Sequence, residues 1–280
     1  MTILESIVLA IVEGLTEFLP ISSTGHMIFT QGLLGMQSTD YSRAFTVMIQ
    51  FGAILSVVVL YWRRFFVPGA QQMGASGDKS TRWKDFFLFY LKLAVGCLPA
   101  AVLGLLLEKQ IDALLGSVWV VATMLLLGGV LMVFVDRIFS KSQGEKITFG
   151  NALWIGFFQC IAMIPGVSRS MATIVGGQQQ GLSRRTAAEF SFFLAVPTMF
   201  GATLLKAYKL YKGFGSAIFA ENWQTLLIGN VVAFLLALVA IRFFINFLTR
   251  YGFKVFGYYR IVVGFLILTL LACGVELTID

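Results

Sequence analysis

The stretch EGLTEFLPISSTGH, residues 13–26, decides the fold of this chain. It closes an apolar segment, 6–19, which is too short to cross a membrane. At 1.5 Å per residue, 14 helical residues reach only about 21 Å, whereas a hydrocarbon core is about 30 Å thick. Beyond Pro20 and a run of hydroxyl-bearing residues, a second short apolar piece follows at 26–34. The pair predicts a re-entrant helical hairpin, which enters the membrane, turns near its middle and leaves on the same side.

The same pattern returns in the second half of the chain. An apolar segment at 151–164 stops at Pro165, and the stretch PGVSRS, residues 165–170, separates it from another short piece at 171–182. The sequence therefore predicts two re-entrant hairpins.

The composition around these hairpins is that of a membrane protein. Of 280 residues, 58% are hydrophobic and 12% are charged, whereas soluble domains are about 45–50% apolar and about 25% charged. Continuous apolar runs of roughly 20 residues exclude a porin-type barrel, whose strands alternate over about 10 residues. We predict an all-α polytopic membrane protein in which two hairpins accompany six transmembrane helices, at roughly 44–62, 86–107, 117–135, 190–208, 225–247 and 255–275.

The basic residues of the loops predict the orientation and account for the formal charge of +7 without a nucleic-acid partner. One side of the predicted topology collects twelve of them: Arg63, Arg64, Lys79, Arg82, Lys84, Arg137, Lys141, Lys146, Arg184, Arg185, Arg250 and Lys254. The other side collects four: Arg43, Lys109, Lys209 and Lys212. The positive-inside rule makes the first side cytoplasmic and places both termini outside. The first hairpin then enters from outside and the second from the cytoplasm.

The opposed hairpins suggest an internal repeat within a single membrane domain, 1–280. Aligning Glu13 with Gln159 brings Ser22 onto Ser168, nine residues later in both halves, and Phe51-Gly52-Ala53 recurs as Phe200-Gly201-Ala202. Each half reads as a hairpin followed by three spans, so the second copy is inverted. The predicted repeats are 1–135, with its hairpin at about 3–34, and 150–275, with its hairpin at about 151–182.

Glu13 and Glu17 form an acidic pair that has to be neutralised. Four residues apart on a helix, they lie on one face, where like charges repel. Each ionised group at the bilayer centre also costs about 2.5–3.5 kcal/mol on insertion scales. A divalent cation, Mg²⁺ or Ca²⁺, would offset both costs, because carboxylate and phosphate oxygens are its preferred ligands. The alternative is a pair of glutamates solvated by a vestibule.

The two hairpin turns carry groups that bind phosphate. Ser22, Ser23 and Thr24 precede one half-helix, and its N-terminus attracts anions through free N–H groups. Ser168, Arg169 and Ser170 open the other half-helix. Simple helix capping by the hydroxyls is the alternative, as is a salt bridge from Arg169 to Glu13 or Glu17.

His26 is the chain's one histidine, close to these hydroxyls in sequence. It is a candidate for deprotonating a nucleophile or protonating a leaving phosphate, and the alternative is a satisfied polar side chain. The residues alone do not rank the three hydroxyls as nucleophiles. Arg260 lies about five residues inside its predicted span, where it could snorkel to the cytoplasmic face; a cavity-lining role is the alternative.

The stretches at 13–26, 165–170 and SRRTAAEFSF, residues 183–192, resemble the BacA-type undecaprenyl pyrophosphate phosphatases. The resemblance implies hydrolysis of a polyprenyl pyrophosphate lipid to the monophosphate and inorganic phosphate in the bacterial cytoplasmic membrane. It also implies an outward-facing site, a divalent cation and bacitracin resistance through recycling of the cell-wall lipid carrier. By position it implies these roles: Glu13 and Glu17 as the metal pair, Ser23 as nucleophile, His26 as its proton partner, Arg169 as phosphate clamp, and Ser22, Thr24, Ser168 and Ser170 as phosphate contacts.

A transporter or flippase of a lipid phosphate or another anion is the alternative function, because inverted repeats and broken helices are also transport architecture. A carrier needs anion-binding donors but no nucleophile beside a base. Membrane lipids are the expected surroundings in either case. The sequence does not decide between a monomer and a homodimer.

Overall fold

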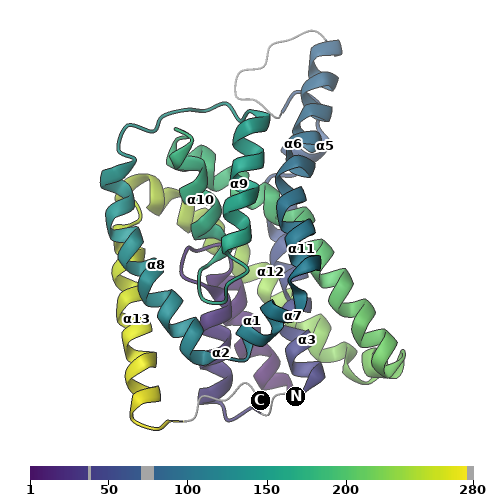
Figure 1. The fold of residues 1–280 in the computed structure, drawn as a ribbon. Helices are drawn as coiled ribbons and strands as arrows, with labels where there is room; N and C mark the ends of the chain where they lie inside the picture. Colours follow the sequence, from purple (N-terminus) through teal and green to yellow (C-terminus); the bar gives the residue numbers. More distant parts are fainter. Residues whose placement is uncertain (37–38, 71–78, 276–280) are drawn as a thin grey trace.

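The computed structural model describes residues 1–36, 39–70 and 79–275, and these are helical with no β-strand among them (Figure 1). Six helical segments are long and apolar enough to cross a membrane, which confirms the predicted all-α fold with six spans. The spans are α3–α4 (Asp40–Met48 and Gln50–Leu60), α6 (Lys79–Leu106), α8 (Val118–Ile138), α11 (Arg184–Phe214), α12 (Ala217–Tyr251) and α13 (Lys254–Ala272). Two further short helices, α5 (Trp62–Phe66) and α7 (Glu108–Leu115), lie in the connections.

The two predicted hairpins are formed by pairs of short helices. In the first, α1 (Ile3–Thr16) ends before Pro20, and α2 (Ser23–Leu33) begins just after it. In the second, α9 (Phe149–Ile161) and α10 (Arg169–Gln179) flank Pro165. Each proline lacks the N–H that would bond the carbonyl four residues earlier, that of Thr16 or Ile161, so each helix ends at that residue. The hairpins come from opposite ends of the molecule, and their turns meet near its middle (Figure 1). Their re-entrant position in a bilayer stays a prediction.

The two halves of the chain exchange packing partners. Helix α1 packs against α12, and α9 packs against α6, so the first helix of each hairpin contacts the middle span of the other half. The first spans, α4 and α11, contact each other, as do the last spans, α8 and α13. Phe51 and Phe200, aligned in the expected repeat, are ring neighbours with centroids 6.1 Å apart. Two copies related by a twofold axis would produce such reciprocal contacts, although the repeat boundaries stay a prediction.

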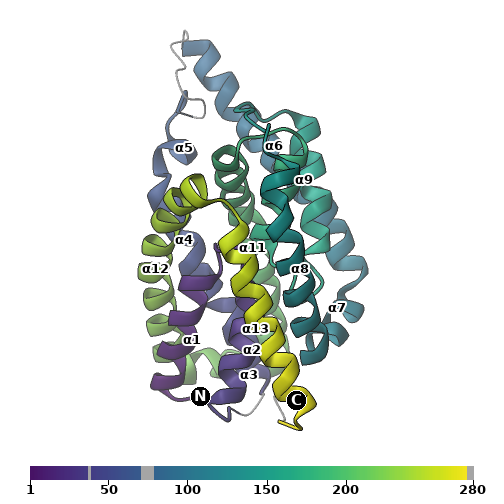
Figure 2. The ribbon, with the colours of Figure 1, turned by 90° about the vertical axis from the view of Figure 1, so that its left-hand side faces the viewer.

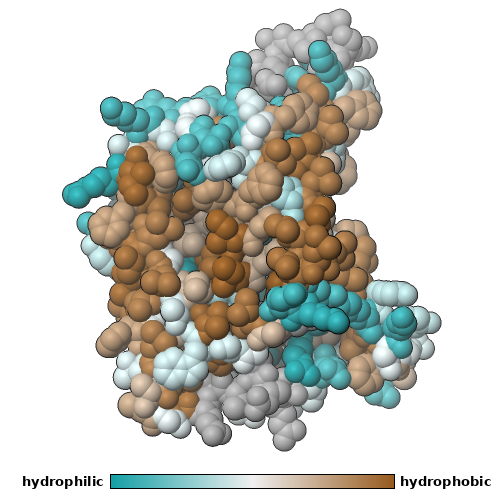
Figure 3. Space-filling model, in the orientation of Figure 1, coloured by the Kyte–Doolittle hydropathy of each residue, from teal (hydrophilic) through white to brown (hydrophobic). Residues whose placement is uncertain are grey.

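The surface and the ends of the molecule match a membrane-spanning protein. An apolar band crosses the face in Figure 3, with hydrophilic residues above it and a hydrophilic strip over α7 below it. The N-terminus lies at the same end of the molecule as the end of α13, and the α8–α9 and α12–α13 connections lie at the other (Figures 1 and 2). The loops that carry the two unequal sets of basic residues are thereby separated.

A backbone contact at Gly52 fixes how closely α4 approaches α12. The Gly52 N–H donates to Asn230 Oδ1 at 2.8 Å, and a Cβ at this glycine would lie 2.1 Å from the Asn230 carbonyl oxygen. A Cβ at the aligned Gly201 would meet nothing within 4 Å. Only the first of these two glycines is required for close packing.

We predict that Gly52→Ala destabilises the protein by about 1–3 kcal/mol, because the helices must separate or shift to admit the methyl group. Gly201→Ala is the matched control and should be neutral or slightly stabilising, since alanine favours a helix. Thermal unfolding of the purified variants in detergent measures both effects. Equal melting temperatures for the two variants would contradict this account of the α4–α12 contact.

Candidate active site

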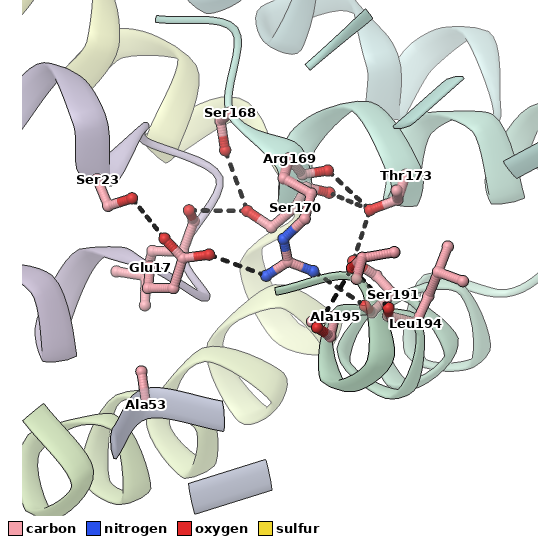
Figure 4. A network of polar contacts seen from close by, with 12 residues as sticks. Glu17, Ser23, Ala53, Ser168, Arg169, Ser170, Thr173, Ser191, Leu194 and Ala195 are labelled. Atoms are coloured by element: carbon pink, nitrogen blue, oxygen red, sulfur yellow. Dashed lines mark hydrogen bonds and ion pairs between the residues drawn. The ribbon is translucent and has the colours of Figure 1, made fainter. Parts of the chain in front are cut away.

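The turns of the two hairpins lie against each other and bring their polar residues into one buried cluster. The Ser170 hydroxyl, at the start of α10, donates to the Leu19 carbonyl in the first turn at 2.8 Å. The Ser168 and Ser170 hydroxyls are 3.1 Å apart. Residues 151 positions apart in the chain are therefore neighbours, and the start of α2 and the start of α10 face one region (Figure 4).

A serine in an unusual conformation precedes each of these half-helices. Ser22 has φ 69° and Ser168 has φ 75°, and no other non-glycine residue in the described part of the chain has a positive φ. Each is an N-cap whose hydroxyl accepts a backbone N–H, from Gly25 and Met171 respectively, at 3.4 Å. Such conformations cost free energy and persist where surrounding contacts impose them. The helix capping considered as the alternative role of Ser22 and Ser168 is therefore present, and their contact with phosphate stays a prediction.

The carboxylate of Glu17 joins the two halves of the cluster. The Ser23 hydroxyl donates to Glu17 Oε2 at 2.5 Å, and Arg169 Nη2 donates to Glu17 Oε1 at 3.1 Å. The other terminal nitrogen of Arg169, Nη1, donates to the Ser191 carbonyl on α11 at 3.1 Å (Figure 4). The salt bridge considered as an alternative for Arg169 is therefore present, and it places the guanidinium one carboxylate away from the Ser23 hydroxyl.

Further contacts hold Arg169 in this position. Its guanidinium lies over the Phe18 ring, 5.8 Å from the centroid. The Thr173 hydroxyl donates to the Arg169 carbonyl at 2.8 Å and lies 2.6 Å from the Ser191 hydroxyl. Arg169 Nε is buried and has no hydrogen-bond partner among the described residues. One donor of the arginine is therefore left for another acceptor.

Glu13 lies at a cavity of about 420 Å³ that also reaches Ser23 and Thr24. Its side chain is 1% exposed, and Oε1 has no hydrogen-bond partner among the described residues. A buried carboxylate oxygen without a partner is costly unless a cation or a proton reaches it. No group of three or more His, Cys, Asp or Glu side chains that could hold a metal occurs in the described ranges. Glu13 and Glu17 thus fit a divalent cation that takes its remaining oxygens from a substrate or water.

The ring nitrogens of His26 hydrogen-bond to groups other than the Ser23 hydroxyl, and its role as the proton partner of Ser23 stays a prediction. Its Nδ1 lies 2.8 Å from the Ser22 carbonyl, and its Nε2 lies 2.7 Å from the Tyr259 hydroxyl. The imidazole stacks on the Tyr259 ring, with centroids 5.6 Å apart. Because a carbonyl only accepts hydrogen bonds, Nδ1 carries the proton. The acceptor next to the Ser23 hydroxyl is instead Glu17.

The structure thus gathers most of the predicted site residues but not all of them. Glu17, Ser23, Arg169 and the hydroxyls of the second turn form the cluster, while Glu13 and Thr24 line the adjoining cavity. His26 faces Tyr259. The sequence reasoning missed Tyr259, Thr173 and Ser191. Thr173 lies one helical turn after Arg169 and Ser170, and Ser191 lies within the stretch 183–192, whereas Tyr259 carries no comparable signal.

Arg260 is the largest departure from expectation. It does not snorkel: its side chain is 0% exposed. It binds five backbone carbonyls, at 2.8–3.2 Å, in both hairpin turns and in α8: Pro20, Gly166, Val167, Met124 and Leu125. All of its acceptors are neutral, so carbonyl dipoles alone solvate the charge. The sequence feature that could have indicated this buried role is the presence of an ionisable residue inside a predicted span.

We predict that Arg260→Met strongly destabilises the protein, because several buried carbonyls lose their donor and each costs about 1–3 kcal/mol. Arg260→Lys keeps the positive charge, but a lysine carries all its N–H donors on one nitrogen. It should therefore restore only part of the lost stability. Arg242→Met, at an exposed position on α12, is the control. Thermal unfolding in detergent measures the series, and unchanged stability of Arg260→Met would refute the bracing role.

Comparison with known proteins identifies the family of this chain. The profile of the family "Bacitracin resistance protein BacA" matches residues 6–266. A protein named undecaprenyl-diphosphatase from Porphyromonas gingivalis (strain W83) is 61% identical over 280 residues, which cover 100% of both chains. A protein of the same name from Flavobacterium psychrophilum is 54% identical over 268 residues, which cover 96% of this chain and 95% of the relative. Another, from Bdellovibrio bacteriovorus, is 48% identical over 282 residues, which cover 99% of both chains. The chain belongs to the BacA family.

Proposed function

We propose that this protein hydrolyses undecaprenyl diphosphate to undecaprenyl phosphate and inorganic phosphate in the bacterial membrane. The observation that carries the proposal is the contact of Ser23 and Arg169 with one buried carboxylate, that of Glu17, in a chain whose relatives bear the phosphatase name over their full length. Release of the monophosphate returns the lipid carrier to cell-wall synthesis and gives resistance to bacitracin, which the family is named for.

Ser23 is the proposed nucleophile, and Glu17 is the group placed to take its proton. With the hydroxyl 2.5 Å from Glu17 Oε2, proton transfer to the carboxylate accompanies attack of Oγ on the terminal phosphorus. The bond to the bridging oxygen breaks, and the lipid monophosphate leaves. Water then attacks the phosphoserine, which releases inorganic phosphate and restores the Ser23 hydroxyl.

Arg169 and the two half-helix N-termini supply the positive charge that this reaction needs. Charge on the transferring phosphoryl group is stabilised by donors that are already in place. Arg169 is held by Glu17 and Ser191 on one side and retains a free Nε. We assign Ser22, Thr24, Ser168 and Ser170 to the same phosphate-binding region, where their backbone or hydroxyl groups start the half-helices.

We assign His26 to positioning or to the later proton transfer rather than to deprotonating Ser23. Its Nδ1–H donates to the carbonyl of Ser22, the residue directly before the nucleophile. The Tyr259 hydroxyl connects Nε2 to α13.

Glu13 and Glu17 would hold a divalent cation, Mg²⁺ or Ca²⁺. When bound, such an ion neutralises the phosphate oxygens and polarises the phosphorus for attack. Glu13 supplies the unpartnered buried oxygen, whereas Glu17 also orients Ser23 and Arg169.

Transport of a lipid phosphate is not favoured. A carrier would use the anion-binding N-termini but would not require a serine hydroxyl within hydrogen-bond reach of a carboxylate. The relatives, moreover, are named as phosphatases.

We further propose that the site faces outward. The cavity beside Ser23 is lined by residues near the start of α3 and by Gly116, between α7 and α8. These elements lie at the end of the molecule that carries the N-terminus and the end of α13 (Figures 1 and 2). The smaller set of basic residues marks this end as the outer one.

Purified protein should release phosphate from undecaprenyl diphosphate in detergent, and a chelator should abolish the release while Mg²⁺ or Ca²⁺ restores it. Ser23→Ala and Arg169→Ala should each lose at least about 100-fold in kcat/KM, because they remove the nucleophile and a transition-state donor. Ser216→Ala, far from the cluster, is the control. Full activity of Ser23→Ala in folded protein would transfer the attack to another group, and an inactive wild type would refute the phosphatase.

Cysteine labelling tests the orientation. In a background with the three native cysteines replaced, Gln143→Cys, at an exposed position in the α8–α9 connection, should resist a membrane-impermeant maleimide in intact cells. Ser216→Cys, between α11 and α12, should react. The reverse pattern would place the site on the cytoplasmic side.

A further inference from the structure

The cavity beside the nucleophile contains cationic side chains that the reaction described above does not use. Its volume of about 420 Å³ lies within the range of small-molecule sites. Glu13, Ser23 and Thr24 line one part of it. Lys206, Arg43 and Gln50 line another, on α11 and on the α3–α4 span. The cavity thus extends from the attacking hydroxyl to a wall that bears two positive side chains.

Lys206 lies within the membrane-spanning helix α11 and is half-buried. Among the described residues it has no hydrogen bond and no ion pair, and Lys209, one turn further along, pairs with Glu108. An unpaired ammonium inside a span is costly unless it faces water or an anion. Lys206 lines the cavity, which offers it both water and a bound anion. The count of basic residues in the loops did not include Lys206, because this lysine falls inside the predicted span 190–208.

Arg43 supplies the second cation of this wall from α3, which packs against α11. It pairs with Asp40 at 3.1 Å, and both side chains are about half exposed. An exposed pair of this kind contributes little to stability. The guanidinium is therefore free to exchange Asp40 for a phosphate at small cost.

We propose that Lys206, assisted by Arg43, forms a second phosphate subsite that holds the phosphate group not attacked by Ser23. The proposal rests on the proposed function: a diphosphate substrate brings two phosphates, and with one of them at Ser23 and Arg169 the other is left for the cationic wall. An ammonium binds phosphate as a point charge without requiring a fixed geometry. The subsite makes the site selective for a diphosphate over a monophosphate.

Two anions distinguish the second subsite from the first. Isothermal titration calorimetry of the full-length protein in detergent measures binding of inorganic diphosphate and of inorganic phosphate. Lys206→Ala should weaken diphosphate binding about tenfold or more, the loss expected for one charge-assisted hydrogen bond. Phosphate, which occupies the Arg169 cluster, should lose no more than about twofold. Lys206→Arg should restore most of the diphosphate affinity.

Lys212→Ala is the matched control, because Lys212 is an exposed lysine on the same helix that does not line the cavity. It should bind both anions as the wild type does. Equal losses for diphosphate and phosphate in Lys206→Ala, or the same loss in Lys212→Ala, would overturn the second subsite. The first result would place Lys206 at the attacked phosphate, and the second would indicate a general effect of charge.

Turnover of the lipid substrate gives an independent measurement. Lys206→Ala should raise KM for undecaprenyl diphosphate about tenfold and change kcat less than about twofold, because the residue binds without touching the breaking bond. Inhibition by lipid monophosphate, which carries the phosphate that is not attacked, should weaken in the variant, whereas inhibition by inorganic phosphate should not; the reverse result would place Lys206 at the attacked phosphate. An unchanged KM with neither inhibition weakened overturns the subsite. A wild type without turnover counts against the phosphatase instead, and calorimetry still decides the subsite.

Discussion

The geometry of this protein depends on one buried arginine. Arg260 reaches from α13 to carbonyls of both hairpin turns and of α8. The three carbonyls of the hairpin turns, those of Pro20, Gly166 and Val167, lie outside helices because α1 and α9 end before Pro20 and Pro165. A guanidinium has five donors in a fixed plane, so it sets the relative positions of the segments that it binds. Each interruption of a helix would be destabilising by itself. Because the Arg260 guanidinium donates hydrogen bonds to carbonyls of both turns, the two interruptions form one rigid junction.

That junction explains the shape of the site. With the turns fixed side by side, α2 and α10 begin in the same region and direct their N-termini toward it. Ser22 and Ser168, the residues with positive φ, are the last residues before these helices. The strain is located where the chain must reverse within a short turn and still present N–H groups to a ligand. Glu17 and Arg169 then meet across the junction, and their charges compensate each other.

Much of this arrangement could be predicted from the sequence, since apolar runs and prolines carry the signal for spans and breaks. The six spans and the two short-helix pairs follow from run length alone, and the spacing of Glu13, Glu17 and Ser23 places them on adjoining helices. The partners of Arg260 could not be predicted, because backbone carbonyls on distant segments have no residue-specific pattern. The contact of His26 with Tyr259 depends on the packing of α13, 233 residues away. Lys206 was hidden because a lysine near a span end resembles a snorkelling residue.

The two hairpins are built alike but carry different charges, and the difference makes the site asymmetric. Under the alignment that joins Ser22 to Ser168, Ser23 corresponds to Arg169, while Glu13 and Glu17 correspond to Gln159 and Met163. One hairpin therefore supplies the acidic pair and the hydroxyl, and the other supplies the cation. A second acidic pair would leave the buried junction with uncompensated negative charge that repels a diphosphate. Gln159 occupies the position that corresponds to Glu13 and adds no negative charge there, because its side chain is a neutral amide. This amide is buried and has no hydrogen-bond partner among the described residues. Divergence of the two turns, rather than their similarity, is what a phosphate-cleaving site requires.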